Sequence, residues 1–567
     1  MDARLPDASA VAALAGLHPV LARIYASRGV RGEDDLDYSL AKLAPVGSLQ
    51  GVDEAVDLLY AHRDEPVIVI GDFDADGATS TALVLRCLRE FGFRSVDYLV
   101  PNRFAFGYGL TPEIVDVAAE RGPALLVTVD NGVSSINGVA RANALGIKVL
   151  VTDHHLPGSA LPEAAAMVNP NLRGGSFASP NLAGVGVAFY VMAALGRRFE
   201  EQGVCGAARV PARFLDLVAL GTVADVVPLD RNNRILVRQG LDRVRAGHGV
   251  SGITALLRIA GRDFSRVCSA DFGFAVGPRL NAAGRLEDMS VGIECLLTDD
   301  PAEAERLAQL LDGINNERRA IESDMQDQAF AFVDAMDARN LPPCVTVYDP
   351  GWHQGVVGLV AARVRERCHR PVVAFAREKA GVLKGSARSV PGVHIRDLLE
   401  AVSTANPGLI EKFGGHAMAA GLSLAEERLG AFRKEVARQL LRLYPDADFR
   451  EALHTDGALP ADSFTLDFAR SLRNAGPWGA GFPEPLFHGA FAVHEQRTVG
   501  ERHLKMRVAA AAGGPTLDAI AFNQSGAVIR GVVELAFKLD VNSYRGVESP
   551  QLIVEQITTL RDTVPSA

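Results

Sequence analysis

The amino-acid sequence predicts an α/β protein whose largest part is a parallel β-sheet with helices on both faces. Two observations predict this fold class. Short, wholly apolar runs such as residues 67–70 and 125–129 have the composition of strands buried on both faces. Segments with helical spacing separate these runs, and strand–helix alternation is typical of parallel sheets. Because 567 residues exceed what one hydrophobic core usually serves, we expect several domains.

The first half of the chain supplies the elements of this sheet. Residues 1–50 have the pattern of short helices with polar joints, so we expect an N-terminal helical segment there. Residues 51–290 are expected to form the parallel-sheet domain. Its predicted strands and helices alternate in the order strand 67–70, helix 80–89, strand 96–100, helix 112–121, strand 125–129, helix 136–145 and strand 149–152.

The second half of the chain changes pattern twice. Apolar residues near helical spacing continue from Pro301 to Asp337 with charges between them, which predicts one long connecting helix within residues 291–340. Strands predicted at 345–348 and 372–375 then belong to a smaller α/β domain over residues 341–450. Alternating runs at 504–508 and 533–539 predict a small antiparallel barrel or sandwich over residues 451–567.

Composition narrows the class of protein only partly. A hydrophobic content of 48% indicates a folded chain, and no apolar run is long enough to cross a bilayer. The first residues lack the apolar core of a signal peptide, and the 6 cysteines are scattered, so we expect reduced thiols and a cytoplasmic protein. The net charge of −10 argues mildly against nucleic acid, but a carboxylate metal site would itself add negative charge, so the charge decides nothing.

The strongest chemical feature is the segment 71–77, Gly-Asp-Phe-Asp-Ala-Asp-Gly, directly after an apolar run. Carboxylates so close together repel one another and remain ionised at low cost only with cations among them. An EF-hand loop is excluded because its twelfth position should be Glu and is Leu83. An aspartyl-phosphate phosphatase would need a hydroxyl residue where Ala78 stands. A metal site at the end of a strand therefore remains the better interpretation.

The same pattern recurs further along the chain. Asp130-Asn131-Gly132 follows one apolar run, Asp153-His154-His155 follows another, and Asp225 ends the apolar stretch 217–224. A single Asp at a strand end is usually a turn or a helix cap, but four such elements with a double His favour a metal centre. Mixed Asp and His ligands favour Mn²⁺ or Mg²⁺, and two ions about 3.5–4 Å apart could share a carboxylate in phosphoryl transfer. His155 could instead only orient its neighbours.

The order and spacing of these motifs resemble the DHH phosphoesterase superfamily. Within it, the chain is similar to the bacterial single-strand-specific exonucleases from about residue 20 to the C-terminus. The segments that carry this closer resemblance are 101–104, 107–109, 277–285, 352–355, 384–389 and 414–416. The resemblance implies a DHH domain, a long connecting helix, a DHHA1 domain and a C-terminal OB-fold β-barrel.

The resemblance also implies an activity and a set of site residues. It implies 5′-to-3′ exonuclease digestion of single-stranded DNA to mononucleotides in DNA repair and recombination, with two Mn²⁺ or Mg²⁺ ions. The implied metal ligands are Asp74, Asp76, Asp130, His154 and Asp225, with Asp72 and His155 beside them. The residues expected to hold the DNA backbone or its 5′ phosphate are Arg103, Arg279, Asn281, Arg285, Ser386, Arg388 and His416.

Partners and competing functions stay open on the sequence alone. We expect a monomer without membrane contact, and single-strand-binding protein and a helicase are candidate partners. One alternative keeps the chemistry but takes short oligonucleotides, cyclic dinucleotides or 3′-phosphoadenosine phosphate as substrates. Another is a non-catalytic replication factor, which the intact acids and His154 disfavour. Aromatic residues such as Phe537 and Tyr544, with Lys538, are candidates for stacking on single strands, although aromatics at strand spacing are more often core.

Overall fold

The computed structural model of the chain describes residues 2–101, 109–336, 341–447, 449, 453–500, 502–524, 529 and 531–559. Its contacts divide the chain into two compact units. The first comprises Met1–Gly284, Asp288–Leu310 and Leu453–Ala567, and the second comprises Arg285–Glu287 and Leu311–Ala452. Among the helices of the described ranges, none combines the length and the apolar character needed to span a membrane.

The first unit contains a five-stranded sheet in which every neighbouring pair is parallel. The strand order is β3-β2-β4-β5-β6. These strands are β2 (Pro66–Ile70), β3 (Ser95–Leu99), β4 (Leu125–Val129), β5 (Lys148–Thr152) and β6 (Ala166–Val168). β4 is buried at every position, as its apolar composition predicts. The parallel sheet expected from strand–helix alternation is confirmed, while the short strand β6 was not predicted.

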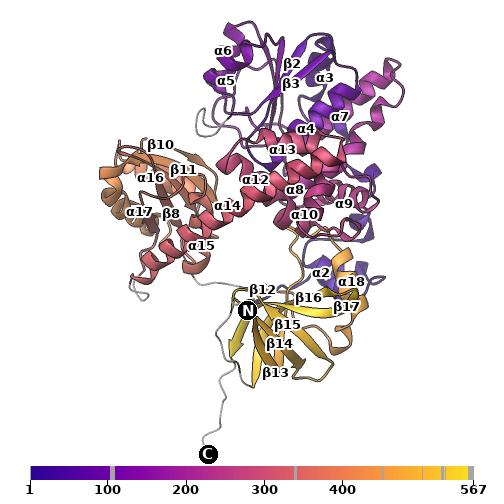
Figure 1. The fold of residues 1–567 in the computed structure, drawn as a ribbon, viewed down its shortest axis with the longest axis vertical. Coiled ribbons are helices and arrows are strands. Elements are labelled where there is room, and N and C mark those ends of the chain that lie inside the picture. The colour runs from indigo at the N-terminus through magenta and orange to yellow at the C-terminus, as the bar shows by residue number, and fades with distance from the viewer. Residues whose placement is uncertain are drawn as a thin grey trace, which may run out of the picture. The chain divides into compact units, whose positions relative to one another are not determined.

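Helices cover both faces of this sheet (Figure 1). α5 and α6 pack on the face that carries Ile68 and Ile70, while α4 and α7 contact the sheet through β2, β4 and β5. The helices of this part of the chain are α3 (Val52–Ala61), α4 (Ala75–Glu90), α5 (Pro112–Ala119), α6 (Ile136–Ala144), α7 (Gly184–Glu201), α8 (Leu215–Ala224), α9 (Arg231–Arg245), α10 (Ser251–Ile259), α11 (Ser269–Asp271), α12 (Gly277–Leu286) and α13 (Ser290–Leu297).

The long helix α14 (Pro301–Asp334) has 34 residues and leads from the first unit into the second. The second unit holds a sheet of order β10-β11-β9-β8-β7, in which only the β7–β8 pair is parallel. Its elements are β7 (Val345–Tyr348), α15 (Val357–Cys368), β8 (Val372–Lys379), β9 (Val382–Arg388), α16 (Ile395–Ala405), β10 (Lys412–Gly415), β11 (Ala419–Ala425) and α17 (Leu429–Leu443). The smaller α/β domain predicted for this region is thus present.

Residues beyond 453 form a closed barrel of order β13-β14-β15-β17-β16. Its elements are β13 (Phe487–Val499), β14 (His503–Ala510), β15 (Thr516–Ala521), β16 (Val532–Tyr544) and β17 (Val547–Thr559), preceded by α18 (Leu466–Asn474). Phe537 is fully buried in its core, so it cannot stack on a nucleic acid. Lys538 lies 3.0 Å from Glu484 and 3.1 Å from Glu555, whereas Tyr544 is 65% exposed.

The N-terminal segment joins the barrel at the other end of the sequence. β1 (Asp2–Ala3) pairs in parallel with β12 (His454–Thr455), and α1 (Ala8–Ala13) precedes α2 (Pro19–Ala26). Two buried residues of α2, Val20 and Ile24, belong to the same hydrophobic cluster as the barrel core. The helix α2 therefore packs as part of the C-terminal barrel, and local sequence patterns do not predict this long-range pairing.

Candidate functional site

The predicted site residues converge at the carboxyl ends of β2, β4 and β5. Because the chain passes from β2 to β3 on one side and to β4 on the other, a topological switch point lies between β2 and β4. Open parallel sheets bind their ligands at such points. Asp72 follows β2, Asp130 follows β4 and His154 follows β5 at this edge. Asp72 and Asp130 are 4% and 2% exposed, so water is largely excluded around them.

The helix α4 begins within the Asp-rich segment and fixes two further carboxylates. Asp74 is its N-cap, and its Oδ1 accepts from the backbone N–H groups of Asp76 and Gly77, each at 3.0 Å. The carboxylate of Asp76 accepts from Gly184 N at 2.6 Å and from Val185 N at 3.0 Å, where α7 begins. The positive end of α7 thus compensates part of the charge of a carboxylate that is only 1% exposed.

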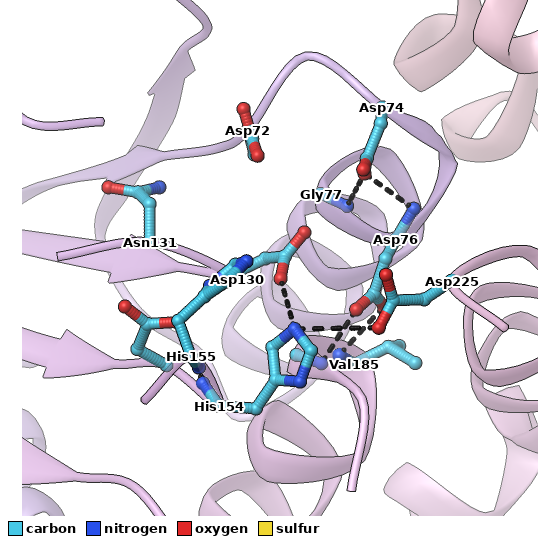
Figure 2. A network of polar contacts seen from close by, with 12 residues as sticks. Asp72, Asp74, Asp76, Gly77, Asp130, Asn131, His154, His155, Val185 and Asp225 are labelled. Carbon is cyan, nitrogen blue, oxygen red and sulfur yellow. Dashed lines mark hydrogen bonds and ion pairs between the residues drawn. The ribbon is translucent and has the colours of Figure 1, made fainter. Parts of the chain in front are cut away.

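His154 lies between two acids from different elements (Figure 2). Its Nε2 is 3.1 Å from Asp130 Oδ1 and 3.5 Å from Asp225 Oδ2. Within the described residues, this buried nitrogen forms no hydrogen bond. Asp225 is the C-cap of α8, so the stretch 217–224 is a helix; the sequence had grouped it with acids at the ends of strands. The helix α8 is buried on almost every side, so its sequence has no periodicity that would distinguish a helix from a strand.

Two glycines that the sequence analysis did not single out allow these acids to approach other backbone segments. A Cβ on Gly184 would lie 2.6 Å from both Cβ and Oδ1 of Asp130. A Cβ on Gly221 would lie 2.3 Å from Thr79 Oγ1 and 2.7 Å from Asp76 Oδ1. The available signal was a glycine within an apolar helix, at the start of α7 for Gly184 and inside α8 for Gly221, which in sequence is indistinguishable from helix–helix packing.

Burial and mutual repulsion make the carboxylates reluctant to ionise. Burial, together with the charge of Asp74, raises the pKa of Asp76 to about 7 against the hydrogen bonds from α7. Burial and the charges of Asp76 and Asp74 hold the pKa values of Asp130 and Asp225 well above the ordinary carboxyl range. The opposite shift would follow if a cation lay among them, because an opposite charge favours the ionised form.

The tandem histidines differ in protonation. Burial and the adjacent charge of His155 lower the pKa of His154 to about 4, so its ring is neutral and can act as a ligand near neutral pH. Burial lowers the pKa of His155 too, but its 2.7 Å hydrogen bond to Asp153 and the charge of that acid outweigh it and raise the pKa to about 9. His155 therefore carries a proton and a positive charge at the edge of the cluster.

Three groups of side chains have ligand atoms that all lie within 4.8 Å of one another. These groups are Asp76, His154 and Asp225; Asp72, Asp74 and Asp130; and Asp130, His154 and His155. The first group combines two carboxylates with one neutral imidazole and the second offers carboxylates alone, and both sets have the chemistry that Mn²⁺ and Mg²⁺ prefer. The buried Nε2 of His154, without a hydrogen bond among the described residues, also fits a metal ion better than a purely structural role.

Comparison with known proteins decides the family. "Single-stranded-DNA-specific exonuclease RecJ" of Escherichia coli (strain K12) is 52% identical over 555 residues, which is 96% of this chain and 96% of that protein. The chain belongs to the RecJ family. RecJ of Thermus thermophilus is 34% identical over 531 residues, covering 93% of this chain and 73% of its relative.

Family and structural comparisons agree with the RecJ assignment. The DHH family N-terminal domain matches residues 66–222, the DHHA1 domain residues 341–441 and the RecJ OB domain residues 455–556. The crystal structure of RecJ from Thermus thermophilus in complex with Mn²⁺ has a TM-score of 0.81 at 30% identity, covering 100% of this chain and 79% of that one. The Mg²⁺ complex of the same protein has a TM-score of 0.75 at 29% identity, with coverage of 100% and 78%.

Three of the residues expected to bind the substrate belong to the first unit, and the structure describes the contacts of two of them. Arg103 lies outside the described residues. Arg279, on α12, donates from Nη1 to Ala275 O at 2.6 Å. Asn281 Oδ1 accepts from Ala75 N at 2.8 Å and so holds the start of α4 beside the Asp-rich segment. This contact gives Asn281 a structural role that its position in the RecJ motif did not reveal.

The remaining substrate-binding candidates lie in the second unit. Arg285 Nη1 donates to Gly355 O at 3.3 Å. Arg388, at the end of β9, donates from Nη1 to Ser386 Oγ at 3.0 Å, and burial together with the charge of Arg365 lowers its pKa. His416 is exposed, and its backbone N–H donates to Ala419 O at 2.8 Å. A hydroxyl held by a half-buried guanidinium is suited to a phosphate oxygen.

Proposed function

We propose that the chain is a metal-dependent exonuclease that hydrolyses single-stranded DNA from its 5′ end to mononucleotides. The observation that carries this proposal is the meeting of carboxylate and histidine groups at the switch point of a parallel sheet, in a chain 52% identical to an exonuclease over 96% of both lengths. The metal-bound RecJ structures of Thermus thermophilus support Mn²⁺ or Mg²⁺ as the cofactor.

Two ions would be held by the two groups that share no residue. Asp76, His154 and Asp225 would hold one, and Asp72, Asp74 and Asp130 would hold the other. Bound in these places, the metal would supply activation of water and stabilisation of the leaving oxygen in phosphodiester hydrolysis. Together the two groups contain the five ligands implied by the family resemblance, with Asp72 as the sixth residue.

The chain's own side chains would orient the substrate and control charge around this centre. His155, fixed by Asp153 and protonated, would place a positive charge beside the reacting phosphate. In the second unit, Arg388 and Ser386 would hold phosphate oxygens, with Arg285 and His416 as further candidates. In the first unit, Arg279 and Arg103 would contact the DNA backbone.

The polymer substrate and the cellular role follow from the resemblance to RecJ enzymes. A closed barrel with an exposed Tyr544 favours single-stranded DNA over a dinucleotide, since such barrels bind strands through stacking and backbone contacts. We extend the proposal to DNA repair and recombination in the cytoplasm, with the chain acting as a monomer and with single-strand-binding protein and a helicase as partners.

A digestion assay tests the activity and its polarity together. A 3′-labelled oligonucleotide, single-stranded or duplex, is incubated with Mn²⁺ or with chelator, using wild type, Asp74→Ala and the control Asp116→Ala. Asp116 is an exposed acid that pairs with Arg141 at 2.7 Å and belongs to none of the three groups of potential metal ligands. We expect progressive shortening of the single strand only, lost with chelator and in Asp74→Ala. If dinucleotides or nucleoside bisphosphates are hydrolysed while long strands survive, the result would support the proposed metal site and contradict single-stranded DNA as the substrate.

A further inference from the structure

We propose that Asn169 and Asn171 are positioning residues for the metal centre, acting by holding the backbone of the His154-His155 turn. Asn171 Nδ2 donates to the carbonyl oxygen of His154 at 2.6 Å. Asn169 Nδ2 donates to the carbonyl oxygen of His155 at 2.9 Å. Both side-chain amides thus donate to carbonyl groups of the tandem histidines, so they act on the site through the backbone of another residue.

The two asparagines are coupled to each other. Asn169 Oδ1 accepts from the backbone N–H of Asn171 at 2.8 Å, so the same side chain holds both its neighbour's backbone and the His155 carbonyl. Asn169 is completely buried, where an amide that lacked partners would be unfavourable. Its hydrogen bonds therefore fix one arrangement of the Asn169–Asn171 turn, and through it the position of the Asn171 amide.

The other side of the histidine turn is held by Asp153. Its Oδ1 accepts from the backbone N–H groups of His154 at 2.7 Å and His155 at 3.1 Å, while Oδ2 accepts from Val133 N at 2.8 Å. The N–H groups of the tandem histidines are thus bound by an acid, and their carbonyl groups by two amides. A ring attached to a turn held on both sides has little freedom to leave the space between Asp130 and Asp225.

The register of the sheet explains why these residues can act on the site. β6 pairs with β5 in parallel, with Thr152 opposite Val168, and Asp153 N donates to Val168 O at 3.1 Å. Asn169 therefore follows β6 directly beside the point where the metal-site segment follows β5. The short edge strand β6 supplies a frame for the histidine turn, although it contributes no ligand to the cluster.

The inference rests on the proposed metal site, and Mn²⁺ binding to metal-stripped full-length protein by calorimetry tests it. Asn171→Ala is the main variant, because Asn171 is only half-buried; Asn169→Ala is the second. Asn143→Ala is the matched control, since its exposed amide donates to Glu163 O at 2.9 Å in the same way but on a carbonyl outside the site. We expect Asn171→Ala to raise the Kd for Mn²⁺ by about 10- to 100-fold, with the control unchanged.

Two further measurements separate positioning from general stability. The metal-free melting temperature of Asn171→Ala should match that of Asn143→Ala, and cleavage of single strands should recover at saturating Mn²⁺. Wild-type Mn²⁺ affinity in Asn171→Ala would overturn the inference, and so would a weakened affinity that only parallels a lowered metal-free melting temperature. If wild type itself bound no Mn²⁺, the proposed function would fail instead, so the two failures are distinguishable.

Discussion

The buried ion pair between Arg28 and Asp456 should determine whether the N-terminal helices stay on the barrel. Their side chains are 1% and 2% exposed, and two parallel hydrogen bonds of 2.7 and 2.9 Å join them. Arg28 also donates from Nε to Pro483 O at 2.7 Å, and Asp456 accepts from Leu486 N at 3.0 Å. The pair therefore links α2 to the segment that leads into the barrel.

Asp456→Ala would leave the guanidinium buried with only neutral acceptors. Removing one partner of a buried ion pair typically costs about 3–5 kcal/mol, because the remaining charge stays desolvated. We expect a loss of that size in the free energy of unfolding of the barrel. The double substitution Arg28→Met with Asp456→Leu should restore much of it, since an apolar pair of similar volume carries no desolvation penalty.

Urea unfolding followed by tryptophan fluorescence measures this loss. The chain has only 2 tryptophans, and Trp478 lies under Arg28, whose Cζ is 5.5 Å from the indole ring. A Trp352→Phe background therefore makes the signal report on the barrel. The control is Asp467→Ala, which breaks an exposed pair with Arg470 and should cost less than about 1 kcal/mol. An equally small effect of Asp456→Ala would refute the reasoning, and Mn²⁺ binding should be unchanged in all variants.

Further expected outcomes concern the metal centre and the barrel. Asparagine tolerates the left-handed φ of 61° at position 130, so Asp130→Asn should fold normally. This variant should reduce single-strand cleavage by more than about 100-fold and retain DNA binding in a gel-shift assay. Cleavage above a tenth of the wild-type rate would contradict the assignment of Asp130 as a metal ligand. From pH 6.5 to about 9 the melting temperature of chelator-treated protein should fall, because Asp76 and His155, with pKa values raised to about 7 and 9, keep protons that the unfolded chain releases. Each such group contributes up to about 1.4 kcal/mol per pH unit, and a melting temperature that rises over this range would contradict the signs. Phe537→Ala should cost about 3–5 kcal/mol of stability, whereas Tyr544→Ala should leave stability unchanged and weaken single-strand binding in a fluorescence titration; the reverse pattern would contradict the assignment of core and surface.

The sequence predicted those features that depend on neighbouring residues in the chain. The apolar run 125–129 coincides with β4, because a strand buried on both faces needs apolar residues throughout. Acids directly after β2 and β4 had to meet, since parallel strands end at one edge of the sheet. The helix that ends at Asp225 was harder to predict from the sequence. Its residues are buried on almost every side, so the sequence of α8 has no amphipathic period.

Contacts between distant segments could not be predicted from local patterns. The pairing of β1 with β12 joins residues more than four hundred positions apart, and a two-residue strand has no sequence signature. Asn281 lies between arginines in a RecJ motif, and its oxygen holds Ala75 N, a contact that the motif does not reveal. A side chain that caps a helix and one that grips a phosphate can have the same sequence context, and only the fold shows which backbone lies within reach.

The metal centre combines charges that would destabilise the fold if nothing opposed them, and its surroundings oppose them in two ways. The amides that begin α7 act on Asp76, and protonated His155 lies beside the cluster, so part of the negative charge is neutralised without any ion. Asn169 and Asn171 carry no charge and fix the backbone from which His154 projects. Charge compensation and backbone positioning should therefore separate experimentally. Loss of a positioning amide should weaken metal binding equally across pH, whereas loss of a compensating group should change how that binding depends on pH.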